Sequence, residues 1–194
     1  MLHNKNYEIL SKFLRDYNKE IYGRELTNIT FLSQKNIALT LDELEKDGIL
    51  KSRKSGNIRY YKLNLENTEI KDVILILETL KKIDFFKKQR KIASLFKTDN
   101  RIVGIFGSYA KGTQKKESDI DIFIIGNKLK EDYDKLGEKL DLNINIKYFP
   151  ENEFINLIKS KDNLIKEIIK DHILIFNIEN LINLIWKNYY GSYN

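Results

Sequence analysis

One segment constrains the fold of this chain more than any other, the stretch between residues 102 and 126. Its sequence, IVGIFGSYAKGTQKKESDIDIFIIG, contains two apolar runs, Ile102–Phe106 and Ile120–Ile125, each as long as a buried strand. Gly107 ends the first run and begins a helix, and Gly112 opens a polar loop. The segment therefore predicts strand, short helix, loop and strand, an arrangement typical of a sheet covered by helices.

Two carboxylates, Asp119 and Asp121, stand where the second apolar run begins. Side chains two positions apart in a strand share a face, so these carboxylates repel each other unless a cation lies between them. Carboxylate, water and phosphate oxygens are the ligands that Mg²⁺ prefers. Gly107 has no Cβ, so the backbone can approach a phosphate there, and the helix-start amides with the Ser108 hydroxyl offer an anion site. The pattern indicates a metal-bound nucleoside triphosphate facing a nucleophile.

These residues resemble the nucleotidyltransferase superfamily that includes DNA polymerase beta, and more narrowly its minimal prokaryotic members. The shared motif is an apolar strand, Gly-Ser, a second glycine and Asp-x-Asp on the next strand, as in Gly107-Ser108 and Asp119-x-Asp121. The resemblance implies that Gly107 and Ser108 bind the triphosphate of ATP or another nucleoside triphosphate. It implies that Asp119 and Asp121 bind Mg²⁺ or Mn²⁺. The residues that it places beside the phosphates are Tyr109, Lys111 and Gly112.

Catalytic members of that superfamily usually carry a third Asp or Glu on the next central strand. Here the predicted strand is LDLNINIKYF, Leu140–Phe149, on which Asp141, Asn143 and Asn145 share one face. Spacing to the following PENEF segment puts the carboxylate position at Asn143, whose amide is a weaker Mg²⁺ ligand and a poor proton acceptor. Asp141 could complete the catalytic metal site if the register shifts, so a complete site and an incomplete one both stay open.

The N-terminal third predicts three helices and then a hairpin. The expected elements, in chain order, cover residues 6–17, 24–29, 34–47, 49–54 and 58–63. Ser33 is a good N-cap for the third helix, and Gly48 suits its C-terminal end. Gly56 supplies the positive φ that a tight hairpin turn needs.

This order of elements resembles a winged helix-turn-helix over about residues 5–65. In that family the start of the recognition helix enters the major groove of DNA, while the hairpin contacts phosphates. The resemblance implies that base edges are read by Ser33, Gln34, Lys35 and Asn36. It implies phosphate contacts from Lys51, Arg53, Lys54 and Arg59. Double-stranded DNA is therefore an expected partner.

A second interpretation of the N-terminal third remains open. The later surface of its third helix is acidic and repels DNA if it faces the backbone; the residues are Asp42, Glu43, Glu45 and Asp47. Winged helices also serve as dimerisation or protein-docking modules, and many pair to match two half-sites. A protein partner or a homodimer therefore stands beside DNA as an expectation.

Residues 66–99 predict linking helices, because apolar residues recur at helical spacing from Glu69 to Lys97. Basic residues cluster at Lys81-Lys82 and between Lys87 and Lys91. These clusters are interpreted either as a solvated helix face or as a segment that contacts phosphates or a second copy of the chain.

The C-terminal segment predicts helix, helix, short edge strand and helix, with the strand at Ile173–Phe176. His172 is interpreted as a turn residue rather than a catalytic base. The tail 191–194 is expected to fray. Aromatic residues near the C-terminus are interpreted as packing or dimer contacts; these are Trp186, Tyr189, Tyr190 and Tyr193.

Composition narrows the kinds of site that are available. The chain has no cysteine, so disulfides, thiolate metal sites and cysteine nucleophiles are excluded, and two histidines, His3 and His172, are too few for a multi-histidine site. No apolar run reaches the roughly 20 residues of a membrane span, which leads us to expect a cytoplasmic protein without membrane contact. Residues 101–194 carry equal numbers of basic and acidic side chains, so the net charge of +6 belongs to the first half. Such asymmetry suggests a nucleic-acid face there.

Together these patterns predict an α/β chain of two domains. A winged helix-turn-helix is expected at residues 1–65, linking helices at 66–99, and a nucleotidyltransferase-type mixed sheet flanked by helices at 100–194. The expected function is Mg²⁺-dependent transfer of a nucleoside monophosphate, AMP from ATP, to a hydroxyl acceptor, which by resemblance could belong to a toxin-like protein partner. The alternatives are a DNA-binding transcriptional regulator that senses a nucleotide through this fold, and an antitoxin-like binding protein.

Overall fold

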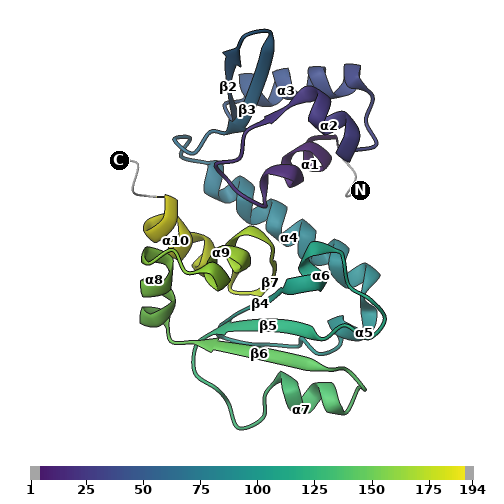
Figure 1. Cartoon of the computed structure of the whole chain (residues 1–194), viewed down its shortest axis with the longest axis vertical. Helices are drawn as coiled ribbons and strands as arrows, with labels where there is room; N and C mark the ends of the chain where they lie inside the picture. Colours follow the sequence, from purple (N-terminus) through teal and green to yellow (C-terminus); the bar gives the residue numbers. More distant parts are fainter. Residues whose placement is uncertain (1–4, 191–194) are drawn as a thin grey trace. The chain divides into compact units, whose positions relative to one another are not determined.

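The computed structural model describes residues 5–190 and divides the chain into two compact units, Met1–Leu77 and Glu78–Asn194 (Figure 1). The first unit contains α1 (Lys5–Leu10), a 3₁₀ turn (Ser11–Phe13), β1 (Ile21–Tyr22), α2 (Gly23–Ile29), α3 (Gln34–Lys46), β2 (Leu50–Ser55) and β3 (Ile58–Leu63). Helix α4 (Ile70–Lys88) runs through the division between the units. The domain boundaries at 65/66 and 99/100 stay a prediction.

The first unit consists of helices followed by a small antiparallel sheet with the strand order β1-β3-β2. Ser33 caps α3, because its hydroxyl accepts a hydrogen bond from the Asn36 amide nitrogen at 3.3 Å. Helix α3 buries Ile37, Leu41 and Leu44 on one face, as its spacing predicts. The β2–β3 hairpin then follows, with Gly56 at φ +57° in its turn.

The second unit is built on a four-stranded sheet with the order β6-β5-β4-β7 (Figure 1). Strands β4 and β5 are antiparallel, β4 and β7 are antiparallel, and β5 and β6 are parallel, so the sheet is mixed. The remaining elements are α5 (Arg90–Ala93), β4 (Ile102–Phe106), α6 (Gly107–Lys111), β5 (Ile120–Ile125), α7 (Tyr133–Glu138), β6 (Ile144–Phe149), α8 (Glu151–Lys159), α9 (Asn163–Lys170), β7 (Ile173–Phe176), α10 (Ile178–Ile185) and a π-helical turn (Trp186–Tyr190).

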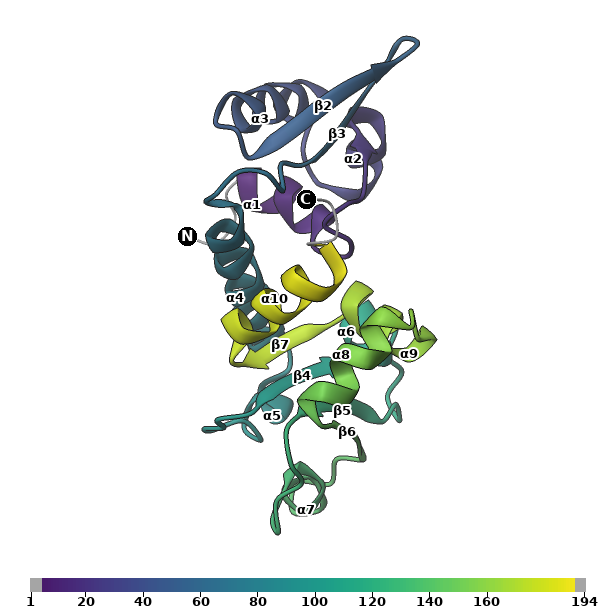
Figure 2. The same cartoon turned by 90° about the vertical axis from the view of Figure 1, so that its left-hand side faces the viewer.

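Both faces of this sheet carry apolar side chains. On one face Ile120, Ile122 and Ile124 of β5 join a buried cluster to which α5 and α7 also contribute. On the other face Phe149 of β6 packs edge-on against Phe154 of α8, with 5.5 Å between ring centroids. Helices α8, α9 and α10 lie next to one another in this unit (Figure 2). The fold class, helices with a small antiparallel sheet and then a mixed sheet flanked by helices, is confirmed.

Several predicted elements differ from the observed ones. The helix predicted over 6–17 is regular only to Leu10 and continues as a 3₁₀ turn. The strand predicted from Leu140 begins at Ile144. Strand β1 and helix α7 have no counterpart among the predicted elements. Among the described residues, no helix is long and apolar enough to cross a membrane.

Candidate functional site

Gly107 lies where β4 ends and α6 begins, and its backbone requires glycine for two reasons. Its φ is +68°, in the left-handed region that a side chain disfavours. A Cβ built on it would stand 2.3 Å from Oδ2 of Asp121, closer than two atoms can approach. The missing side chain therefore lets the start of α6 lie directly against the Asp121 carboxylate.

Asp119 and Asp121 stand at the start of β5, as predicted. The intervening Ile120 is buried, so strand alternation turns both carboxylates to the opposite face. Asp119 is exposed and Asp121 is half-buried. Asp121 is opposite Phe106 of β4, next to Gly107, which brings the Gly-Ser turn and the Asp-x-Asp pair to one end of the sheet.

Asn145 of β6 is the polar side chain that joins this pair. In the parallel β5–β6 ladder Asn145 is in register with Asp121, and its Nδ2 donates a hydrogen bond to Asp121 Oδ1 at 3.0 Å. Asp121 is thus held on both sides, with Oδ2 against Gly107 and Oδ1 bonded to Asn145. The amide occupies the place beside the second aspartate that the sequence analysis assigned to Asn143.

The prediction that Asp141 supplies a third carboxylate needs correction. The strand begins at Ile144, so Asp141 precedes it in a turn with φ +46° and does not share the strand face of Asn145. Its carbonyl oxygen accepts a hydrogen bond from Lys91 Nζ at 3.4 Å. Within residues 5–190, no three His, Cys, Asp or Glu side chains converge as a metal site would require.

Asn143 is also placed differently from the prediction. It lies one residue before β6, and its carbonyl oxygen accepts the amide hydrogen of Ile120 at 2.8 Å, a bond that starts the β5–β6 ladder. The signal for Asn145 was present in the sequence, because it lies on the predicted polar face. Only the pairing of β6 with β5 identifies it as the residue opposite Asp121.

The residues after Ser108 complete the short helix α6, and the chain then continues through a loop to β5. Gly112 ends α6 at φ +72°, and the Thr113 amide donates to the Ser108 carbonyl oxygen at 3.0 Å. Ser108 itself is half-buried. Lys111, predicted to bind phosphate, forms an ion pair with Glu167 of α9. The Lys111 ammonium is therefore held toward α9 in this structure.

These oxygens suit a divalent cation. Asp119 and Asp121 offer carboxylate oxygens on one face, and the site contains neither thiolate nor imidazole. The backbone at Gly107 has no Cβ that would keep a phosphate away from it. Asn145 adds a neutral amide, which can bind a cation through its oxygen but cannot take up a proton at neutral pH.

The predicted base-reading residues of the first unit lie at the start of α3. Ser33 caps the helix, Gln34 and Lys35 are exposed, and Asn36 Oδ1 accepts a hydrogen bond from Lys5 Nζ at 3.4 Å. These four residues share one helix end, as the resemblance implies. Whether they contact DNA stays a prediction.

Most of the predicted phosphate-binding side chains of the hairpin are engaged within the chain. Lys51 pairs with Glu66, and Arg53 pairs with Glu20. Hydrogen bonds from Arg53 hold the pKa of Glu20 below its ordinary value.

Arg59 donates to Asp42 at 3.1 Å and also pairs with Glu45. The basic hairpin and the acidic face of α3 therefore neutralise each other in part.

His172 lies in the connection between α9 and β7 and is buried. Its Nδ1 lies 2.7 Å from the Ile168 carbonyl oxygen, and its Nε2 lies 3.3 Å from Glu78 Oε1. Burial alone would raise the pKa of Glu78, but the Lys81 ammonium and His172 together hold it below its ordinary value. No part of this pair reaches the Asp-x-Asp site, consistent with the interpretation that His172 is not a catalytic base.

The C-terminal aromatic residues pack against one another. The rings of Trp186 and Tyr190 are 6.2 Å apart, and those of Tyr189 and Tyr190 are 4.9 Å apart. These side chains were interpreted in the sequence as packing or dimer contacts, and the ring contacts show packing within the chain. Tyr193 and the tail 191–194 lie outside the described residues.

Comparison with known proteins finds a family similarity within the second unit. Residues 90–180 match the family model described as "Polymerase beta, Nucleotidyltransferase", so this segment is similar to the nucleotidyltransferase domains of that family. The match contains the Gly-Ser turn, the Asp-x-Asp pair and Asn145. In a comparison with curated proteins, none matches the chain.

A distant structural similarity spans nearly the whole chain. The structure described as "Structure of TrmBL2, an archaeal chromatin protein, shows a novel mode of DNA binding" is 13% identical, with a TM-score of 0.27, over 96% of this chain and 92% of that chain. A similarity at this level does not bear on fold or function.

Proposed function

We propose that this chain binds a nucleoside triphosphate together with a divalent cation and transfers the nucleoside monophosphate to a hydroxyl group. The observation that carries the proposal is the Asp121 carboxylate packed against Cβ-less Gly107, beside Asp119, in a segment that matches the polymerase beta nucleotidyltransferases. We propose ATP as the nucleotide and a protein hydroxyl as the acceptor.

Each site residue has a role in this proposal. Asp119 and Asp121 would hold Mg²⁺ or Mn²⁺, which when bound neutralises charge on the triphosphate. Gly107 and Ser108 line the approach of the phosphates. The acceptor oxygen bonds to the α-phosphorus, the bond to pyrophosphate breaks, and the hydroxyl proton passes to solvent, because Asn145 cannot accept it.

Labelled ATP tests the proposal directly. The full chain with Mg²⁺ and a cell extract should transfer label from the α-phosphate to protein, and Asp119→Asn with Asp121→Asn should abolish both transfer and ATP binding. Glu117→Gln, in the exposed loop before the pair, is the matched control and should change neither. Transfer that survives the double substitution contradicts these assignments.

A second candidate function is favoured by Asn145. A site that binds the nucleotide but lacks a proton-accepting side chain beside Asp121 suits a regulator that senses ATP through this domain. In that case the chain binds ATP and Mg²⁺ without measurable transfer. The DNA-binding role of the first unit would then be the output that the nucleotide changes.

Asn145→Asp separates the two candidates. A carboxylate at this position adds a third acidic ligand beside Asp121, so Mn²⁺ should bind more tightly in an electron paramagnetic resonance titration. If the natural chain is a sensor, the substitution should also raise transfer from background. If the natural chain already transfers AMP well, the sensor candidate is wrong.

A further inference from the structure

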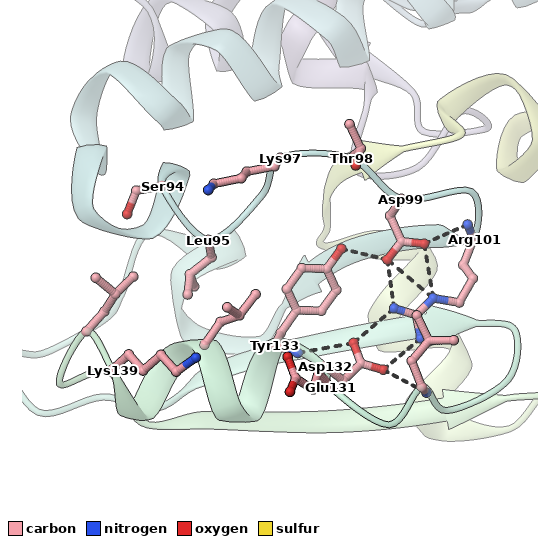
Figure 3. A pocket seen from close by; sticks show the side chains of 13 residues that line it. Ser94, Leu95, Lys97, Thr98, Asp99, Arg101, Glu131, Asp132, Tyr133 and Lys139 are labelled. Atoms are coloured by element: carbon pink, nitrogen blue, oxygen red, sulfur yellow. Dashed lines mark hydrogen bonds and ion pairs between the residues drawn. The ribbon is translucent and has the colours of Figure 1, made fainter.

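A cavity lies at the opposite end of the β4–β5 pair from the Asp-x-Asp site. It has a volume of about 500 Å³ and is lined by the segment after α5, the residue before β4 and helix α7 (Figure 3). Leu95, Tyr133 and Leu140 contribute apolar surface, and Leu136 is 39% exposed at its mouth. A cavity of this size with apolar walls is typical of a binding site.

The charged side chains in the wall of this cavity already bond to one another and are not available to a ligand. Arg101 uses all five of its N–H groups on Asp99, Asp132 and the Asn127 carbonyl oxygen. Tyr133 donates its hydroxyl to Asp99 at 2.7 Å (Figure 3). This network therefore holds the cavity in shape, and recognition is left to the apolar surface and the rim.

A second hollow, of about 350 Å³, is lined by residues of α4 and α5. It is lined by Ile83, Phe86 and Ala93, with Lys87 and Arg90 at its edge. Ala93 is followed directly by Ser94, which lines the larger cavity, so one short segment separates the two.

A row of aromatic rings joins the two hollows beneath the surface. Phe86, in the wall of the second hollow, stacks on Phe96 at 6.0 Å and 18°. Phe96 in turn contacts Tyr133, in the wall of the large cavity, at 5.0 Å. One lining residue of each hollow therefore belongs to the same cluster of packed rings.

The rim of this double hollow is basic. Lys97 and Lys139 border the large cavity, and Lys87 and Arg90 border the second hollow, while the exposed acidic residue among the lining groups is Glu131. No ion pair is found for these four cations within the described part of the chain. An apolar floor between cations complements a chain that carries apolar and acidic side chains alternately.

We propose that this double hollow docks an acidic segment of a partner protein, with one apolar side chain in each hollow. Two hollows that share a ring cluster suit two anchors on one peptide, and the rim cations suit the carboxylates that flank them. Nucleic acid fits less well, because phosphates gain nothing from the apolar floors. The basic cluster around Lys87–Lys91 then belongs to a protein-docking surface.

Fluorescence anisotropy on the full chain tests the proposal. The probes are short fluorescein-labelled peptides of glutamate and alanine that carry one leucine and one phenylalanine at increasing separations. One separation should bind best, and Lys97→Glu with Lys139→Glu should weaken that peptide about tenfold or more through lost charge attraction. Leu136→Asp, at the exposed mouth, should weaken it similarly without unfolding the chain.

Controls distinguish this site from general attraction of acidic peptides. Lys166→Glu with Lys170→Glu, on exposed positions of α9, makes the same charge change elsewhere and should leave binding unchanged. The proposal is overturned if no peptide binds, or if both double variants weaken binding equally. It is also overturned if duplex DNA displaces the peptide, or if the natural chain is a dimer that Leu136→Asp dissociates.

Discussion

At the scale of single residues, the Asp121 carboxylate fills the space that a side chain at position 107 would need. The position at φ +68° and the 2.3 Å gap to Asp121 Oδ2 leave no room for a side chain. Any substitution at Gly107 must move the carboxylate that Asn145 holds on its other side. The arrangement of the site therefore depends on the absence of one methyl group.

Gly107→Ala is expected to abolish nucleotide binding and to cost roughly 1–3 kcal/mol in the free energy of unfolding. The added Cβ strains the left-handed backbone and displaces Asp121. Urea unfolding measures the stability, and titration with ATP and Mg²⁺ measures binding.

Gly56→Ala, in the β2–β3 turn outside the site, is the matched control for that substitution. Gly56 also has a left-handed backbone angle, φ +57°, but nothing lies within 4 Å of the Cβ it would gain. It should lose stability through the strained backbone and keep its nucleotide affinity. Equal loss of binding in both variants would show that the contact with Asp121 is not what matters.

The identity of the residue that faces Asp121 could not be predicted from the sequence. Alternation along the strand correctly put Asn145 on the polar face, and it identified Asp119 and Asp121 as neighbours. It could not say which amide faces Asp121, because register in a parallel pair is set by backbone pairing between strands distant in sequence. The left-handed turn at Asp141 removed the remaining candidate.

At the scale of elements, helix α7 is attached to the sheet by buried charge. Asp132 caps the helix and accepts from Arg101, from the Leu129 amide and from the Tyr148 hydroxyl. Burial alone would raise the pKa of Asp132, but hydrogen bonds from Arg101 hold it below its ordinary value. Without this carboxylate, the largely buried Arg101 guanidinium would keep only Asp99 as an acidic partner.

Asp132→Asn is therefore expected to lower the free energy of unfolding by about 3 kcal/mol. Tyr148→Phe, which removes one hydrogen bond to the same carboxylate, should cost only about 1 kcal/mol. Urea unfolding checks both. If the two variants lose the same stability, the ion pair contributes no more than a neutral hydrogen bond.

The β2–β3 hairpin supports a prediction about DNA. Arg53 is already bound to Glu20, whereas the structure assigns Lys54 no such ion pair within residues 5–190. If the hairpin contacts phosphates, Lys54→Ala should weaken duplex binding more than Arg53→Ala and reduce its salt dependence by about one ion. Anisotropy with a labelled duplex at several salt concentrations measures this.

Releasing Arg53 provides the complementary variant. Glu20→Gln removes the charge that holds Arg53 and should strengthen duplex binding. A larger loss from Arg53→Ala than from Lys54→Ala would contradict the idea that the ion pair competes with DNA.

Helices and strands that have strong local sequence signals were predicted correctly, and those that lack such signals were not. Ser33 and Gly48 define α3, Gly56 defines the hairpin, and the apolar runs define β4 and β5. Strand β1 has two residues and exists because Ile21 and Tyr22 pair with β3. Nothing local specifies such a strand, which is why it was not predicted.

At the scale of the whole molecule, buried carboxylates make stability depend on pH. The pKa values of Glu78, Asp99 and Asp132 all lie below their ordinary values, because nearby cations and hydrogen bonds outweigh the cost of burial. The unfolded chain therefore binds more protons than the folded chain in acid. Their contribution to stability is complete above the ordinary carboxyl pKa of about 4 and is lost as the pH falls through the lowered values.

Urea unfolding of the full chain between about pH 7 and pH 3 should show this loss, with little change above about pH 5. Asp132→Asn should make the decrease shallower, because one of the three carboxylates is gone. An unfolding free energy that stays constant down to about pH 3 would contradict the lowered pKa values.

The parallel pairing of β5 and β6 has a consequence for how such a chain can diversify. Parallel neighbours cannot be joined by a tight turn, so residues 126–143 must travel back along the sheet before β6 begins. That return carries α7 and one wall of the large cavity, whereas Asp121 and Asn145 lie on the strands that it connects. Exposed residues of this return can therefore be substituted without moving Asp121 or Asn145, so the surface of the cavity and the Asp-x-Asp end of the sheet are free to change separately.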